Sequence, residues 1–179
     1  MGVLKPRWHG NGFIQVYLNP VTRLHIWSPE FPATRVVNAQ IHDHRFTFTS
    51  KILMGELHNV VYACTPYEKG EHMLSEVYCG GYDKTKEPKP LHRVVMQRIE
   101  PEVYKPGDIY EFGGPGNFHE TECHGLTVTI MTKPAIDGTV WANVVSPYPE
   151  VPDHAFEPDK APSEEAMLKE VARVTALLW

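Results

Sequence analysis

Short runs in which hydrophobic and polar residues alternate dominate the chain between residues 12 and 145. Because successive side chains of a strand point to opposite faces, this alternation is typical of half-buried β-strands. Asn-Pro, Ser-Pro and Gly-rich turns separate the runs, and no helical pattern interrupts them. We expect strands at 13–18, 22–27, 35–42, 57–64, 74–79, 93–99, 103–104, 108–112, 126–131 and 140–145, with the 35–42 run continuing to about residue 55. The pattern favours an all-β antiparallel sandwich, jelly roll or barrel.

The pattern changes to helical spacing near the C-terminus, where we expect one helix over residues 163–178. Ser163 can cap it, and Glu164 and Glu165 suit its positive N-terminal end. Its apolar stripe consists of Leu168, Val171, Thr175 and Leu178, flanked by Met167 and Val174. We expect this stripe to dock on the outside of the barrel; pairing with a second subunit is the alternative.

Three segments follow from these patterns. Residues 1–145 form the β-barrel domain, the Pro-rich residues 146–162 form a strap, and residues 163–179 form the C-terminal helix. Within the barrel, residues 80–91 carry three lysines and read as an exposed loop, with a mobile lid as the alternative.

Composition narrows the class of partner and the compartment. The net charge of −5 does not favour nucleic acid as a partner, and no apolar run approaches the roughly 18 residues of a membrane span. No signal-peptide pattern opens the chain. The three cysteines (Cys64, Cys79 and Cys123) form no CxxC pair and are odd in number, which favours a reducing, cytoplasmic setting.

Two histidines, His42 and His44, are the most informative residues of the chain. On a strand, residues at i and i+2 share a face, so both imidazoles can converge on one metal ion while Asp43 faces away. A third histidine, His119, follows a Pro/Gly-rich turn far downstream. The three together suggest a metal held inside a β-barrel.

At these residues the sequence resembles the cupin superfamily. The first cupin motif has the form G-x5-HxH-x3–4-E-x6-G, which His42-Asp43-His44 and Gly55 match in part. The second, G-x5-PxG-x2-H-x3-N, resembles Gly107-Asp108 followed by Pro115-Gly116-Asn117-Phe118-His119, with a slightly longer loop. The resemblance implies a double-stranded β-helix, a jelly-roll barrel, with metal ligands His42, His44 and His119.

The sequence departs from the cupin pattern at the glutamate ligand. That residue would fall at Phe48 or Thr49, and Phe48 shares the face of the two histidines. Three neutral imidazoles would leave positions open on the metal and keep its full charge, which favours an anionic, chelating ligand. Imidazole suits Fe(II), Zn, Ni, Cu and Mn alike. Fe(II) is preferred here because a glutamate-less three-His site resembles the thiol dioxygenases, such as cysteine dioxygenase.

The resemblance to thiol dioxygenases is incomplete. No cysteine stands at 47–50 for a Cys-Tyr cross-link, and the residues after His119 offer no counterpart of the Ser-His-Tyr relay. The function it implies is an oxidoreductase, a dioxygenase-like enzyme acting on a small anionic substrate.

Several polar residues are candidates for a role beside the metal. Gln40 shares parity with His42, Tyr62 can donate a proton, and Glu111 can act as a base or replace the lost ligand; we take these three as catalytic candidates. For Glu111, an exposed position on a strand is the favoured interpretation. Further candidates are the proton donors His58 and Tyr110, the carboxylate-binding Arg35 and Arg45 (the latter with outward parity), Glu120 facing away from the metal, and an apolar wall of Phe46, Phe48, Phe112 and Phe118.

Two other functions stay open. One is a cupin that binds a small molecule without catalysis. The other is a metal-free jelly roll similar to sugar-nucleotide epimerases, in which His119 acts as a base near Glu111 and Tyr110. A Ser-His-Asp hydrolase is disfavoured because no Gly-x-Ser-x-Gly elbow occurs, and phosphate loops of the Walker or dinucleotide type are also absent. We also expect a homodimer, the commonest symmetric assembly.

Overall fold

The computed structural model describes residues 5–31, 40–79, 85–135, 140–150, 152 and 161–178. These residues form strands and one helix, in the order β1 (Pro6–His9), β2 (Phe13–Tyr17), β3 (Thr22–Trp27), β4 (Ile41–His42), β5 (Thr47–Met54), β6 (Leu57–Pro66), β7 (His72–Tyr78), β8 (Lys89–Arg98), β9 (Glu102–Tyr104), β10 (Ile109–Gly113), β11 (Phe118–Cys123), β12 (Thr127–Thr132), β13 (Trp141–Pro147) and α1 (Glu164–Leu178). The predicted all-β class with a C-terminal helix is confirmed.

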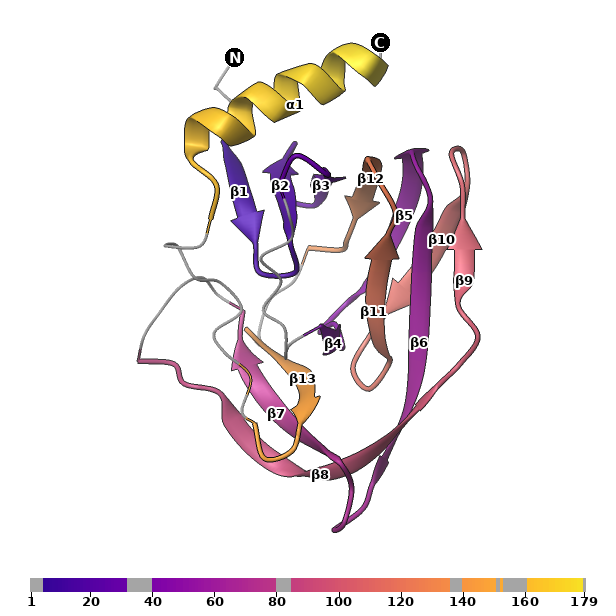
Figure 1. The fold of residues 1–179 in the computed structure, drawn as a ribbon, viewed down its shortest axis with the longest axis vertical. Helices are drawn as coiled ribbons and strands as arrows, with labels where there is room; N and C mark the ends of the chain where they lie inside the picture. The colour runs from indigo at the N-terminus through magenta and orange to yellow at the C-terminus, as the bar shows by residue number, and fades with distance from the viewer. Residues whose placement is uncertain are drawn as a thin grey trace.

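The strands form two antiparallel sheets. The first has the order β1-β2-β3-β12-β5-β10, and the second β11-β4-β13-β7-β8-β6-β9. In the second sheet β11 pairs with both β4 and β6, so the strands from β11 round to β6 close into a ring. The crossovers between distant parts of the chain are those of a jelly-roll sandwich, and Figure 1 shows the short β4 near the centre of the molecule, where it pairs with β11 and β13.

The six-stranded sheet has two apolar faces at its N-terminal strands, because helix α1 covers the outer face there. Its outer face presents Ile14, Val16, Leu24 and Ile26, which pack with Met167 and Val174 of α1. Its inner face presents Phe13, Trp27, Phe48 and Met131 toward the interior. A third cluster, composed of Leu74, Val94, Phe118 and Val145, comes from four strands of the closed ring.

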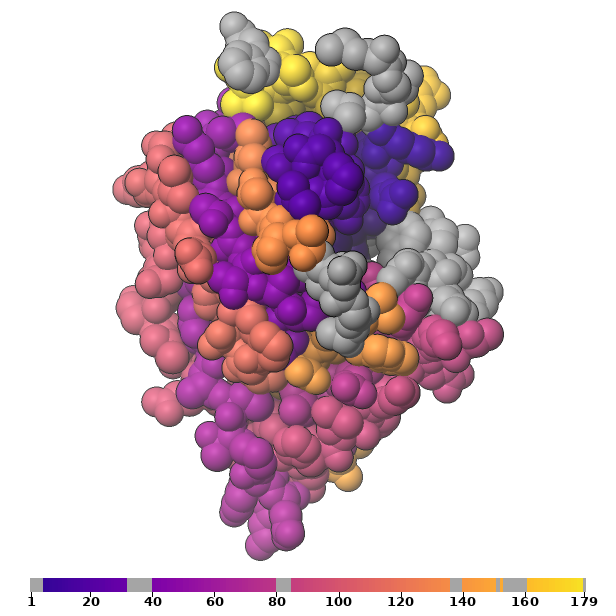
Figure 2. Space-filling view, turned by 180° about the vertical axis from the view of Figure 1, so that it is seen from behind, coloured from indigo at the N-terminus to yellow at the C-terminus, as the bar shows by residue number. Residues whose placement is uncertain are grey.

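Helix α1 begins where its cap predicts, since the Ser163 hydroxyl accepts a hydrogen bond from the Ala166 N–H at 3.2 Å. The helix lies against the N-terminal strands at one end of the molecule (Figure 2), where Met167 and Val174 pack with residues of β2 and β3. The apolar stripe is rotated from the predicted one: Met167 and Val174 are buried, whereas Thr175 is exposed. The flanking residues of the prediction are therefore the centre of the contact.

The structure differs from the expected strands in three places. Strands β1 and β11 were not expected, so His119 lies on a strand rather than in a turn. Strand β8 begins at Lys89, which takes the last residues of the expected 80–91 loop into the sheet. The rest of that loop up to residue 84, residues 35–39 of an expected strand and most of the 146–162 strap lie outside the described residues.

Candidate metal centre

Three segments that are distant in sequence bring His42, His44 and His119 together. His42 ends β4, His44 follows it, and His119 lies on β11 directly opposite His42. The ring centroids are 4.9 Å apart for His42–His44 and for His42–His119, and 5.0 Å apart for His44–His119. One nitrogen from each ring lies within 4.8 Å of the other two, close enough for all three to bind one ion.

Hydrogen bonds fix the orientation of two of these rings. The Nδ1–H of His42 donates to the Gln40 carbonyl at 2.7 Å, and the Nδ1–H of His119 donates to Asn59 Oδ1 at 2.6 Å. Each ring therefore carries its lone pair on Nε2. Metal-binding histidines are typically held in this way, with the second nitrogen donating to a carbonyl or carboxylate.

The spacing of the nitrogens fits a metal ion. His44 Nε2 lies 2.9 Å from His119 Nε2. Two nitrogens bound at about 2.1 Å to one ion lie about 3.0 Å apart when they subtend a right angle. Without a metal, one of the two facing nitrogens must carry a proton; a metal ion can take the place of that proton.

The electrostatics of the cluster favour neutral rings. Burial lowers the pKa of His42, of His44 and of His119, and the neighbouring His42 lowers the pKa of the other two further. A histidine must be neutral to bind a metal, so all three are in the binding form at physiological pH.

Asp43 determines how the two neighbouring histidines are presented. It is 2% exposed and accepts hydrogen bonds from the N–H of Gly116 at 2.9 Å, from the N–H of Asn143 at 2.8 Å and from Asn143 Nδ2 at 2.7 Å. As expected, it faces away from the cluster. These bonds pull the chain out of the strand after His42, so the expected continuous His-x-His strand is wrong, although both rings still converge.

Aromatic rings surround the histidines on the inner face of the first sheet. Phe48 lies 4.9 Å from His44, Phe112 lies 4.4 Å from His119, and Phe46 lies 5.6 Å from His44, all between ring centroids. Phe48 therefore shares the face of the histidines, as its parity predicts. Phe118 belongs instead to the cluster within the closed ring, so the wall has three of its four expected members.

Gly113 lets the end of β10 approach this wall. Its φ is +107°, and a Cβ there would lie 2.4 Å from the carbonyl oxygen of Phe46. The Gly114 N–H donates to the same oxygen at 3.0 Å, which links the turn before β11 to the segment before β5. Only glycine meets both requirements at residue 113.

The three catalytic candidates do not gather at the histidines. Gln40 contributes its backbone carbonyl, through the bond to His42. Tyr62 pairs with Phe118 across β6 and β11 while His119 pairs with Val61, so Tyr62 lies on the opposite face from His119. Glu111 is exposed and pairs with Thr49 on the outer face of the first sheet, because it alternates with the buried Tyr110 and with Phe112. The orientation toward the histidines expected for Tyr62 is therefore wrong, and Glu111 has the exposed strand position that was favoured over its catalytic role.

Tyr62 has a partner of its own. Its hydroxyl donates to Glu120, which lies on the same face and points away from the histidines, as expected. Burial, with Glu120 beside it, raises the pKa of Tyr62, so the hydroxyl keeps its proton. Tyr110 is buried and stacks on Tyr104 at 4.3 Å, an ordinary packing role. Arg35 lies outside the described residues.

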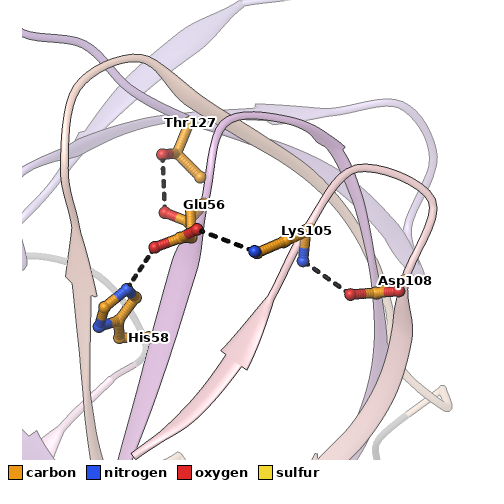
Figure 3. A network of polar contacts seen from close by, with 5 residues as sticks. All are labelled: Glu56, His58, Lys105, Asp108 and Thr127. Carbon is orange, nitrogen blue, oxygen red and sulfur yellow. Dashed lines mark hydrogen bonds and ion pairs between the residues drawn. The ribbon is translucent and has the colours of Figure 1, made fainter.

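A second group of possible ligands lies at the rim of the barrel, where His58, Glu122 and His124 approach one another. Figure 3 shows that His58 is already bonded to Glu56, at 2.7 Å, and that Glu56 also faces Lys105 at 3.9 Å. Glu122 in turn pairs with Arg98 at 3.3 Å. These side chains form a partly exposed ion-pair network, in which His124 is exposed, whereas His119 of the three-histidine cluster is buried.

Asn59 is the contributor that sequence reasoning missed. It is fully buried; its Oδ1 accepts the hydrogen bond from His119, and its Nδ2 has no hydrogen-bond partner among the described residues. A signal existed, since Asn59 is a lone amide beside the apolar residues Leu57, Val60 and Val61 of a buried strand. Buried amides are usually retained for a specific hydrogen bond.

No family model and no curated protein matches the chain. Among solved structures, it is similar to the Drosophila melanogaster CENP-C cupin domain, with a TM-score of 0.35 and 8% identity, over 68% of this chain and 69% of that one. It is also similar to E. coli ycfD, with a TM-score of 0.34 and 15% identity, over 86% of this chain but 39% of that one. Both likenesses are faint, so the fold class rests on the strand topology. Among the described residues, no helix has the length and apolar character to cross a membrane.

Proposed function

We propose that the protein is a cupin-type metal-binding protein that holds one divalent transition metal through His42, His44 and His119. The observation that carries this proposal is the enclosed cluster of three neutral imidazoles, two of them oriented by hydrogen bonds from Nδ1. Donors of this kind suit Fe(II), Zn, Ni and Mn, and we propose Fe(II) as the resident metal.

We further propose that the protein is an oxidoreductase, of the dioxygenase type, acting on a small anionic substrate. A bound Fe(II) would supply the ability to activate dioxygen. The chain itself contributes neutral ligands that leave the charge of the metal uncompensated, which favours an anionic ligand. Phe46, Phe48 and Phe112 limit the access of water to the histidines, and a low-dielectric surrounding strengthens that attraction.

A non-catalytic binding protein would use the same cluster. Only an assay of substrate turnover distinguishes it from the proposed enzyme. The epimerase-like alternative has less support. It needs a histidine base paired with a carboxylate, whereas His42 and His119 pair with a carbonyl and an amide, and Glu111 faces outward. Metal stoichiometry separates this alternative from the proposed function. The cytoplasmic location and the homodimer remain predictions.

The first experiment is elemental analysis of the untagged protein beside the His42→Ala/His44→Ala double variant, each before and after reconstitution with Fe(II). We expect about one metal per chain in the wild type and none in the variant. The matched control is His58→Ala/His124→Ala, which removes two histidines from the rim network and should keep the metal. No metal in the reconstituted wild type, or equal metal in both double variants, would overturn the proposed centre.

Oxygen uptake then tests the enzyme proposal. Metal-loaded wild type is mixed with cysteine and other small thiols that carry a carboxylate, and dioxygen is followed with an electrode. Consumption that requires both thiol and metal, and is lost in His42→Ala/His44→Ala, supports a dioxygenase. Full metal occupancy without consumption for any of these thiols counts against a thiol dioxygenase and favours the binding protein.

A further inference from the structure

Positive side chains gather at one end of the inner face of the six-stranded sheet, although the chain has a net charge of −5. Arg23 lies on β3 opposite Tyr17 of β2 and Met131 of β12. Lys133 follows β12 and is held beside β3, because its N–H donates to the Val21 carbonyl at 2.9 Å. Both side chains are partly buried.

These two cations border the candidate metal centre through one shared ring. The Cζ atom of Arg23 lies 5.6 Å from the centroid of the Phe46 ring, and the Nζ atom of Lys133 lies 5.4 Å from it. The same ring lies 5.6 Å from His44. A small molecule that reaches the histidines along Phe46 would therefore also meet Arg23 and Lys133.

One polar atom of this cation pair lacks a partner in the part of the chain that the structure describes: Arg23 Nε is buried and forms no hydrogen bond there. Among the described residues, no carboxylate forms an ion pair with Arg23 or Lys133. The Cζ atom of Arg23 lies over the Tyr17 ring at 5.1 Å and over the Phe46 ring at 5.6 Å, so its described neighbours include two aromatic rings. A buried donor without a partner is costly, so its retention indicates that a ligand supplies the acceptor.

Charge repulsion points the same way. Burial lowers the pKa of Arg23 and of Lys133, and the nearby Arg45 lowers both further. Arg23 also lowers the pKa of Lys133. Like charges brought together in a partly buried place favour the binding of an anion, which relieves their repulsion.

We propose that Arg23 and Lys133 form an anion-binding subsite that receives a carboxylate or phosphate group of the ligand whose other end reaches the three-histidine centre. This inference rests on the proposed function for the metal-bound end, and it narrows the substrate to a molecule with two polar ends. Arg23 is the specificity-determining residue, since a guanidinium group can donate two parallel hydrogen bonds to either anion. Lys133 adds a second positive charge.

Calorimetric titration with two probes, succinate and inorganic phosphate, tests the subsite at low ionic strength. Each probe is added to the metal-loaded and to the chelator-treated protein. We expect Arg23→Gln to weaken binding of the preferred probe by about tenfold or more, and Lys133→Gln to weaken it by a smaller factor. The matched control is Lys51→Gln, because Lys51 is exposed on the other face of the same sheet; its affinity should stay within about twofold of wild type.

The outcomes separate the subsite from the metal centre. Binding that depends on Arg23 in both protein forms supports the subsite even where the metal proposal fails. Tighter binding of succinate to the metal-loaded form supports the two-ended ligand, and the probe that binds better identifies the anion class. If neither probe binds the wild type at millimolar concentration, or if Arg23→Gln and Lys133→Gln, folded by circular dichroism, bind like wild type, the subsite is overturned.

Discussion

Replacing Asn59 by alanine should weaken metal binding without touching a metal ligand. Asn59 Oδ1 accepts the Nδ1–H of His119 at 2.6 Å, and both side chains are buried. The variant leaves that N–H without an acceptor and frees the ring to rotate or to change tautomer. A second residue that orients a metal-binding histidine typically accounts for 10- to 100-fold in metal affinity, or about 1.4–2.8 kcal/mol.

The affinity is measured by competition with a chromophoric chelator, using Zn(II) and Co(II). Asn117→Ala is the matched control, because the Asn117 amide donates its hydrogen bond to the Gly113 carbonyl, at 2.8 Å, and not to a histidine ring. Asn59→Asp is the rescue variant, since a carboxylate still accepts the Nδ1–H and should restore most of the affinity. A folded Asn59→Ala variant that binds both metals as tightly as Asn117→Ala would refute the reasoning.

Two further predictions concern the surroundings of the histidines. Phe48 is 6% exposed, so Phe48→Glu buries a carboxylate and should destabilise the metal-free protein by roughly 3 kcal/mol or more. Zn(II) should then raise the melting temperature of the variant more than that of the wild type. An equal rise in both proteins would contradict a shared site. Asp43→Ala removes the acceptor of three hydrogen bonds and should lower the free energy of unfolding, measured in urea, by about 3 kcal/mol. The control is Asp108→Ala, which removes the acceptor of one hydrogen bond in an exposed turn and should lower it by about 1 kcal/mol. Equal losses in these two variants would show that the Asp43 bonds do not hold the segment.

The three histidines of the proposed metal centre could be predicted from sequence because their signals are local. Two histidines separated by one residue, and a third after a Pro-Gly turn, fall in a fixed order along the chain. The parity of Phe48 likewise survives a change of backbone path, since it depends on side-chain alternation within β5. Helix α1 was predictable from its cap and its apolar spacing, although the stripe that docks is centred one position away from the expected one.

Other parts of the site depend on strand register, which no local pattern specifies. Tyr62 and Glu111 are plausible catalytic residues in sequence, yet pairing with Phe118 and with Thr49 turns them away from the histidines. A strand has two faces, and only the partner strand decides which face meets the interior. Asn59 was missed as a contributor to the site, because the residue that it contacts, His119, lies 60 positions away in the sequence.

The sequence by itself determined the all-β class, the C-terminal helix and the three histidines, because hydrophobic alternation, capping and ligand spacing act over a few residues. The tertiary structure decided which polar groups accompany the histidines. Arg23 and Lys133 come from strands that meet only after the sheet has formed, and they lie beside Phe46 because β3 pairs with β12. Electrostatic environment is a property of distance in space, so the anion-binding subsite becomes visible only in the folded chain.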